Sequence, residues 1–111
     1  MLPEERDAAH LWDMLSAARE VRTMLQGVSL EQFQSALIVM RATERCIEII
    51  GEAANKVSAE TRSQSNAIPW QDISGMRNRL IHAYFDVDLD VVWSTVTKEL
   101  PSLKAELDRL L

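Results

Sequence analysis

Hydrophobic residues recur every three or four positions along most of this chain, the spacing expected for helices that bury one face. The first run starts beside Pro3, which suits a first helical turn, and stops before Gly27, which favours a helix C-terminus. We therefore expect a first helix over residues 4–26. Its buried positions are Leu11, Leu15, Ala18, Val21 and Leu25.

A second helix is expected from Ser29 to the polar stretch that starts at residue 58, because Ser29 and Gln32 together resemble a capping box. Two apolar stripes run side by side along it. One stripe suffices to pack a helix on its own bundle, so we expect this helix to contact a second copy of the chain in a homodimer. The stripes are Leu30, Phe33, Leu37 and Met40, and Val39, Cys46, Ile50, Ala53 and Val57.

The sequence SAETRSQSNA, residues 58–67, is polar and is expected to form one long loop with a frayed helical start. Pro69 then marks the beginning of a third helix, which we expect over residues 69–84. The buried face of that helix consists of Trp70, Ile73, Met76 and Leu80.

The fourth helix is expected to follow the turn FDVD, with Asp86 or Asp88 as its N-cap. Pro101 interrupts its register, so we expect a kink there rather than a second domain. No segment alternates as a strand does. The sequence thus predicts one domain over residues 1–111, an all-α, up-down bundle of four main helices with a kinked C-terminal helix. The apolar positions of the last helix are Leu89, Val92, Val96, Leu100, Leu103, Leu107 and Leu110.

Composition narrows the class of protein. Of the 111 residues 47% are hydrophobic, enough for a core without disulfides or metal, and Cys46 has no second cysteine to pair with. The longest aliphatic stretch, ALIVM, is far shorter than the roughly 20 residues that span a bilayer, and the N-terminus lacks a secretory signal. We expect a soluble cytoplasmic protein. The net charge of -5 argues against broad attraction to nucleic acid, although residues 69–85 are net positive.

The stretch RNRLIHAY gathers Arg77, Asn78, His82 and Tyr84 within one helical segment. Asn78 and His82 are four positions apart and share a helix face, whereas Arg77 lies roughly 140° from His82 around the axis. Tyr84 lies almost above Arg77. A regular helix therefore cannot gather all four side chains, and a second chain or an early helix end would have to complete the cluster.

These residue types suit the cleavage of a phosphodiester. An arginine offers a fixed fork of donors that matches phosphate oxygens, and a histidine takes up and returns a proton near neutral pH. If the attacking group is a ribose 2′-hydroxyl, the substrate is RNA and no metal is required. Asn78 would orient the imidazole or bind phosphate. The same spacing also fits a surface ion pair or an interface contact.

Other site types find little support in the sequence. The run DVDLD, residues 86–90, lacks the glycine and the final glutamate of a calcium loop, and two histidines and one cysteine far apart do not suit a zinc site. We therefore expect no metal and no cofactor. Glu52 either reaches the cleft or is an ordinary carboxylate on a helix surface, and we expect the second.

RNRLIHAY resembles the R-x4-H-x-Y signature of the HEPN superfamily, in the branch of HepT-type ribonuclease toxins. Three flanking blocks are similar to that branch in order and spacing, so the resemblance covers most of residues 30–105. The blocks are IEIIGEAA at 47–54, IPWQDISGMRN at 68–78 and YFDVDLDVVW at 84–93.

The resemblance implies a toxin of a type VII toxin–antitoxin system that dimerises so that its two motifs meet in one cleft. Arg77 and His82 would be the catalytic pair of a metal-independent endoribonuclease, with Asn78 in support. A nucleotidyltransferase antitoxin would transfer AMP from ATP to Tyr84 and so block the anion site. The competing hypothesis is a catalytically silent helical module that binds a nucleotidyltransferase partner or a nucleotide.

Overall fold

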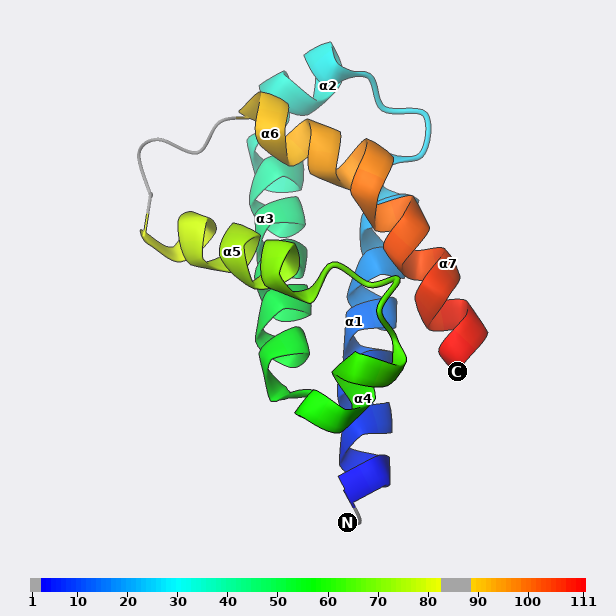
Figure 1. The fold of residues 1–111 in the computed structure, drawn as a ribbon. Coiled ribbons are helices and arrows are strands. Elements are labelled where there is room, and N and C mark those ends of the chain that lie inside the picture. Colours follow the sequence, from blue (N-terminus) through cyan, green and yellow to red (C-terminus); the bar gives the residue numbers. More distant parts are fainter. Residues whose placement is uncertain (1–2, 83–88) are drawn as a thin grey trace.

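The computed structural model describes residues 3–82 and 89–111, without the side chains of residues 3, 4, 79–82 and 89–91. Helices make up most of these two ranges, and neither contains a strand (Figure 1). Four long helical segments form the bundle: α1 (Pro3–Leu25), α3 (Leu37–Lys56), α5 (Trp70–His82), and a continuous segment built from α6 (Leu89–Ser94), η1 (Thr95–Glu99) and α7 (Leu100–Leu110). The all-α fold with four main helices is therefore as predicted.

The first helix, α1, spans Pro3–Leu25 and ends where the sequence predicts. Gly27 has a φ of 75°, in the left-handed region that glycine adopts without strain, and Val28 N donates to Leu25 O at 3.0 Å to close the helix end. The chain then reverses, so that α1 and α3 (Leu37–Lys56) run in opposite directions side by side (Figure 1).

The predicted second helix is two helices, α2 (Leu30–Ser35) and α3, separated at Ala36. The capping box is present, since Ser29 N donates to Gln32 Oε1 at 2.9 Å and Gln32 N donates to Ser29 Oγ at 3.2 Å. The prediction of one continuous helix was wrong because a distant contact intervenes. Phe33 is fully buried, with its ring centroid 5.2 Å from that of Trp93 in α6, and the break turns α2 toward that contact.

Both apolar stripes of α3 are largely used inside the chain. Cys46 and Ile50, from the second stripe, are 5% and 2% exposed, because α3 packs against α1 on one side and α5 on another. The doubled stripe therefore reflects a helix in the middle of the bundle. A homodimer contact through this helix stays a prediction, and Leu37 of the first stripe is 58% exposed.

The polar stretch was predicted to be a loop with a frayed helical start. Instead it contains a short regular helix, α4 (Ala59–Gln64). Ser58 caps α4 and also donates from its backbone N and its Oγ to Asp7, at 3.0 and 2.5 Å. Thr61 donates to the same carboxylate at 2.5 Å, and Arg62 donates to two carbonyls at the end of α3 at 2.9 and 3.1 Å. Polar residues thus fold here because side chains satisfy the backbone and one another.

The third predicted helix is α5 (Trp70–His82); residues 83 and 84, and the N-cap expected from Asp86 or Asp88, lie outside the described residues. After α6 (Leu89–Ser94) the helix widens into a π-helical turn, η1 (Thr95–Glu99), and continues as α7 (Leu100–Leu110).

At Pro101, where a kink was predicted, the structure has this π-helical turn just ahead of the proline. Leu100 N donates to Thr95 O, five residues back, in place of the usual four. Proline lacks an N–H and crowds the carbonyl four residues before it, so a wider turn just ahead of Pro101 accommodates the ring without ending the helix.

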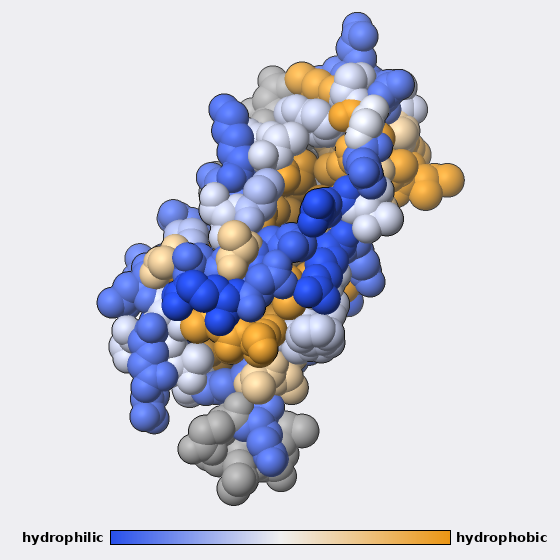
Figure 2. Space-filling model, turned by 90° about the vertical axis from the view of Figure 1, so that its right-hand side faces the viewer, coloured by the Kyte–Doolittle hydropathy of each residue, from blue (hydrophilic) through white to orange (hydrophobic). Residues whose placement is uncertain are grey.

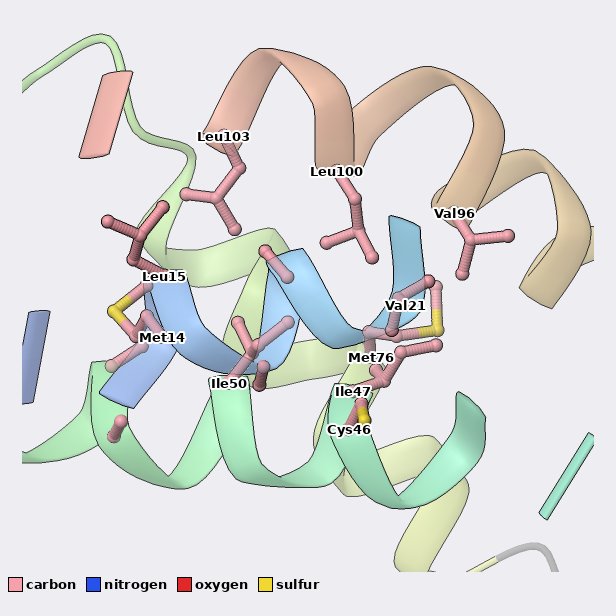
Figure 3. Close-up of a cluster of buried hydrophobic side chains, with 14 of the residues drawn as sticks. Met14, Leu15, Val21, Cys46, Ile47, Ile50, Met76, Val96, Leu100 and Leu103 are labelled. Carbon is pink, nitrogen blue, oxygen red and sulfur yellow. The ribbon is translucent and has the colours of Figure 1, made fainter. Parts of the chain in front are cut away.

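One core joins these helices. Figure 3 shows Leu15 of α1, Ile50 of α3 and Leu100 of α7 converging on a common interior. The predicted positions of the first and last helices lie in it, with Leu15, Val92 and Leu107 at most 1% exposed; Leu25 and Leu110 are partly buried, and the side chain of Leu89 lies outside the described residues, as does that of Leu80 on α5. On α5, Met76 is 9% exposed, and Trp70 and Ile73 pack partly buried against the same core.

Candidate functional site

The motif arginine lies where α5 crosses α3 at very short range. A Cβ added at Gly51 would be 2.2 Å from Arg77 Cβ and 2.7 Å from Arg77 Cγ, so only glycine fits at this position of α3. The aliphatic stem of Arg77 therefore lies against the backbone of α3. Its whole side chain is 28% exposed, which leaves the guanidinium end close to solvent.

Two neighbours hold that guanidinium. Arg77 Nη1 donates to Asn78 Oδ1 at 3.1 Å, and Arg77 Nη2 is 3.9 Å from Glu52 Oε1 on α3. Arg77 Nε is buried and has no hydrogen-bond partner among the described residues. The structure thus brings Arg77 and Asn78 together, and among the described residues no acceptor takes a hydrogen bond from Arg77 Nη2.

Glu52 lies beside Arg77, the alternative that was less favoured from the sequence than a plain surface position. Its Oε1 is 3.7 Å from Arg45 Nη1, and Arg45 Nη1 is in turn 3.2 Å from Glu48 Oε2. The signal was present, because Arg45, Glu48 and Glu52 recur at intervals of three and four on one face of α3. The crossing of α5 over α3, which brings Arg77 to that face, could not be predicted from the sequence.

The remaining motif residues are placed only in part. His82 is the last residue of α5, so the helix is regular from Arg77 to His82 and the two positions face different directions. The side chain of His82 and the whole of Tyr84 lie outside the described residues.

Cys46 is the one cysteine of the chain, and its surroundings make it a poor nucleophile. Burial, together with a contact from Cys46 Sγ to Glu20 Oε2 at 3.5 Å, raises the pKa of the thiol to about 11. The thiolate is the reactive form, so Cys46 stays protonated and inert near neutral pH.

A wide groove of about 620 Å³ opens between α1 and the η1–α7 segment, away from the motif. Its lining includes the apolar residues Val21, Leu25 and Pro101 and the basic residues Arg22 and Lys104. Figure 2 shows the side of the molecule on which α7 lies, where hydrophobic surface is exposed between hydrophilic side chains. The described residues that line this groove include none from α5.

Two general features of the described chain complete the picture. No described helix is both long enough and apolar enough to cross a membrane. Among the described residues, no three His, Cys, Asp or Glu side chains cluster as metal ligands.

An all-helical bundle that presents an Arg–Asn pair at the start of an R-x4-H-x-Y motif is a HEPN-type protein. This chain belongs to the HepT-like ribonuclease family, because the family profile described as "Ribonuclease HepT-like" matches residues 14–110.

Individual relatives are similar over most of their length. The "Probable ribonuclease HepT" of Thermococcus cleftensis is 35% identical over 101 residues, which cover 91% of this chain and 92% of the relative. A protein of Methanocaldococcus jannaschii, named as a candidate RNase, is 34% identical over 99% of this chain and 95% of its own. Another protein so named, from Caldanaerobacter subterraneus, is 39% identical over 78% of each chain. No solved structure is significantly similar to this chain.

Proposed function

We propose that this protein is a metal-independent endoribonuclease toxin of a type VII toxin–antitoxin system. Two copies would form a homodimer whose cleft holds both motifs, and Arg77 and His82 would cleave RNA there with Asn78 in support. The observation that carries the proposal is the setting of Arg77 in a chain of the HepT-like ribonuclease family: its stem is fixed against Gly51 while its guanidinium reaches the surface.

The chemistry follows from the two side chains. His82 would accept the proton of a ribose 2′-hydroxyl, or deliver a proton to the leaving oxygen. The 2′ oxygen bonds to the adjacent phosphorus, and the bond from that phosphorus to the 5′ oxygen of the next nucleotide breaks. Arg77 would bind the phosphate oxygens as negative charge accumulates on them. Because the nucleophile belongs to the RNA itself, the reaction does not need a metal-activated water.

The homodimer is part of this proposal because Arg77 and His82 lie roughly 140° apart on one helix, so a second chain has to complete the site. Exposed apolar side chains on α3 support such an assembly. Leu37 and Ile38 are 58% and 85% exposed at the start of the helix that also carries Glu52. Adjacent large aliphatic side chains in water favour burial against another surface.

The proposed antitoxin is a nucleotidyltransferase that adenylylates Tyr84. The tyrosine oxygen would bond to the α-phosphorus of ATP, and pyrophosphate would leave. The attached phosphate would lie two positions beyond His82 and would compete with RNA for the guanidinium of Arg77. Incubation with the partner and ATP should therefore add one or more adenylyl masses, and Tyr84→Phe should abolish the gain. A gain that persists in Tyr84→Phe would place the modification elsewhere.

The decisive experiment compares RNA cleavage by the purified wild type and by His82→Ala, each with and without EDTA. We expect the wild type to cleave RNA in both conditions, and His82→Ala to remain folded and dimeric without cleaving. Size-exclusion chromatography and circular dichroism check the second expectation. Intact RNA after incubation with unmodified wild type would favour the silent interaction module, which the same fold and the same nucleotidyltransferase partner also accommodate.

A further inference from the structure

A chain of alternating charges connects α3 to the motif. Glu52 Oε1 stands between two guanidinium groups, 3.7 Å from Arg45 Nη1 and 3.9 Å from Arg77 Nη2. Arg45 is also 3.2 Å from Glu48, one turn earlier on α3. Among the described residues, Glu52 is the carboxylate that faces Arg77, and its side chain is 37% exposed at the edge of the site.

We infer that Glu52 is a positioning residue for Arg77, held in place by Arg45. The inference rests on the endoribonuclease function proposed above. A separation of 3.9 Å is too long for a hydrogen bond, so Glu52 attracts the guanidinium without occupying the protons on Nη2. Asn78 holds the Nη1 end at 3.1 Å. The two contacts orient the guanidinium, and neither of these described neighbours takes a proton of Nη2, which would donate to the oxygens of a phosphate.

Arg45 weakens the attraction between Glu52 and Arg77. A carboxylate beside a phosphate-binding arginine competes with the phosphate, since both are anions. Arg45 attracts the same oxygen of Glu52, at 3.7 Å, and partly neutralises it, although its own side chain is 59% exposed and the pair is therefore weak. Glu52 is thereby kept near enough to orient Arg77 and is kept from closing onto it.

The aliphatic stem of Arg77 limits the directions that its guanidinium can take. Arg77 Cβ and Cγ lie against Gly51, so rotation near the backbone is restricted, and the guanidinium can be turned only about its outer bonds. One neighbouring charge then suffices to select its direction. Preorganised donors of this kind act on the transition state, where the phosphate carries more charge than it does in the bound substrate.

The test compares Glu52→Gln with Glu48→Gln. Both remove one negative charge from the same face of α3, but only Glu52 faces Arg77. For Glu52→Gln we expect kcat to fall about tenfold while KM stays constant or decreases, because orientation is lost while a competing anion is removed. For Glu48→Gln we expect kcat within about twofold of wild type. A rise in KM alone, a faster enzyme, or equal losses in both variants would overturn the inference.

A second readout does not depend on catalysis. In ¹⁵N-labelled protein the Nε–H signal of Arg77, assigned by its disappearance in Arg77→Lys, should shift in Glu52→Gln and stay in place in Glu48→Gln. An Arg77 Nε–H signal with the same chemical shift in Glu52→Gln as in wild type would refute the positioning role. A shift in that signal together with a wild type that leaves RNA intact would uphold the contact and refute the proposed ribonuclease function instead.

Discussion

The close crossing of α3 and α5 predicts that Gly51→Ala is destabilising although it places a good helix former inside a helix. The new methyl group would be 2.2 Å from Arg77 Cβ, whereas non-bonded carbons pack at about 3.5–4.0 Å. The two helices would have to separate by more than about 1 Å, because a Cβ cannot rotate away as the end of a flexible side chain can. Overpacking of this kind costs roughly 1–3 kcal/mol or more, against a gain of at most about 1 kcal/mol in helix propensity.

Gly75 provides the matched control. It lies within α5, and a Cβ added there would meet nothing within 4 Å. Gly75→Ala should therefore stabilise the protein by about 0.5–1 kcal/mol through helix propensity alone. The two variants change the same residue type in the same way and differ in what the methyl group meets.

Urea unfolding followed by circular dichroism measures both changes. We expect the midpoint to fall in Gly51→Ala and to rise in Gly75→Ala. A further variant distinguishes the contact from other causes. In the Gly51→Ala background, Arg77→Gly removes both crowded carbons and should recover more of the loss than Arg77→Ala, which keeps the Cβ, although glycine is the poorer helix former by about 1 kcal/mol. If the urea midpoint rises equally in Gly51→Ala and Gly75→Ala, the inference of a close contact between α3 and α5 is wrong.

Two more predictions concern titrating groups. Hydrogen bonds from Ser58, then from Thr61, lower the pKa of Asp7, so its stabilising contribution is full above the unfolded pKa of about 3.9 and is lost as pH falls through the lower folded value. Wild type should therefore lose stability below about pH 4 more steeply than Asp7→Asn; parallel acid unfolding curves would contradict this. With its pKa raised to about 11, Cys46 should react with a thiol reagent at neutral pH only after unfolding, and rapid reaction of folded protein would be inconsistent with its burial.

The sequence predicted which residue types form the candidate site, but it predicted their arrangement in space only in part. The motif fixed attention on Arg77 and Asn78, which do contact each other at 3.1 Å. Glu52 was considered but expected at an ordinary surface position, and Gly51 was missed, because the contribution of both depends on which helix crosses α3 and at what distance. A carboxylate on a helix face does not predict such a crossing, and neither does a glycine inside a helix.

The sequence by itself determined the local features of the helices. The end of α1 at Gly27, the capping box at Ser29, the irregular turn before Pro101 and the buried face of the last helix all follow from residues within one or two turns of one another. Such interactions act in any conformation that contains the helix, so the pattern of residues suffices to predict them.

Tertiary structure decided the rest. The break at Ala36 arises from Phe33 meeting Trp93, and the helix α4 arises where Asp7 binds residues more than fifty positions away. The site at Arg77 depends on α5 passing over Gly51. Each of these features depends on a contact between segments far apart in the chain, and its energy becomes available only when the whole bundle has packed.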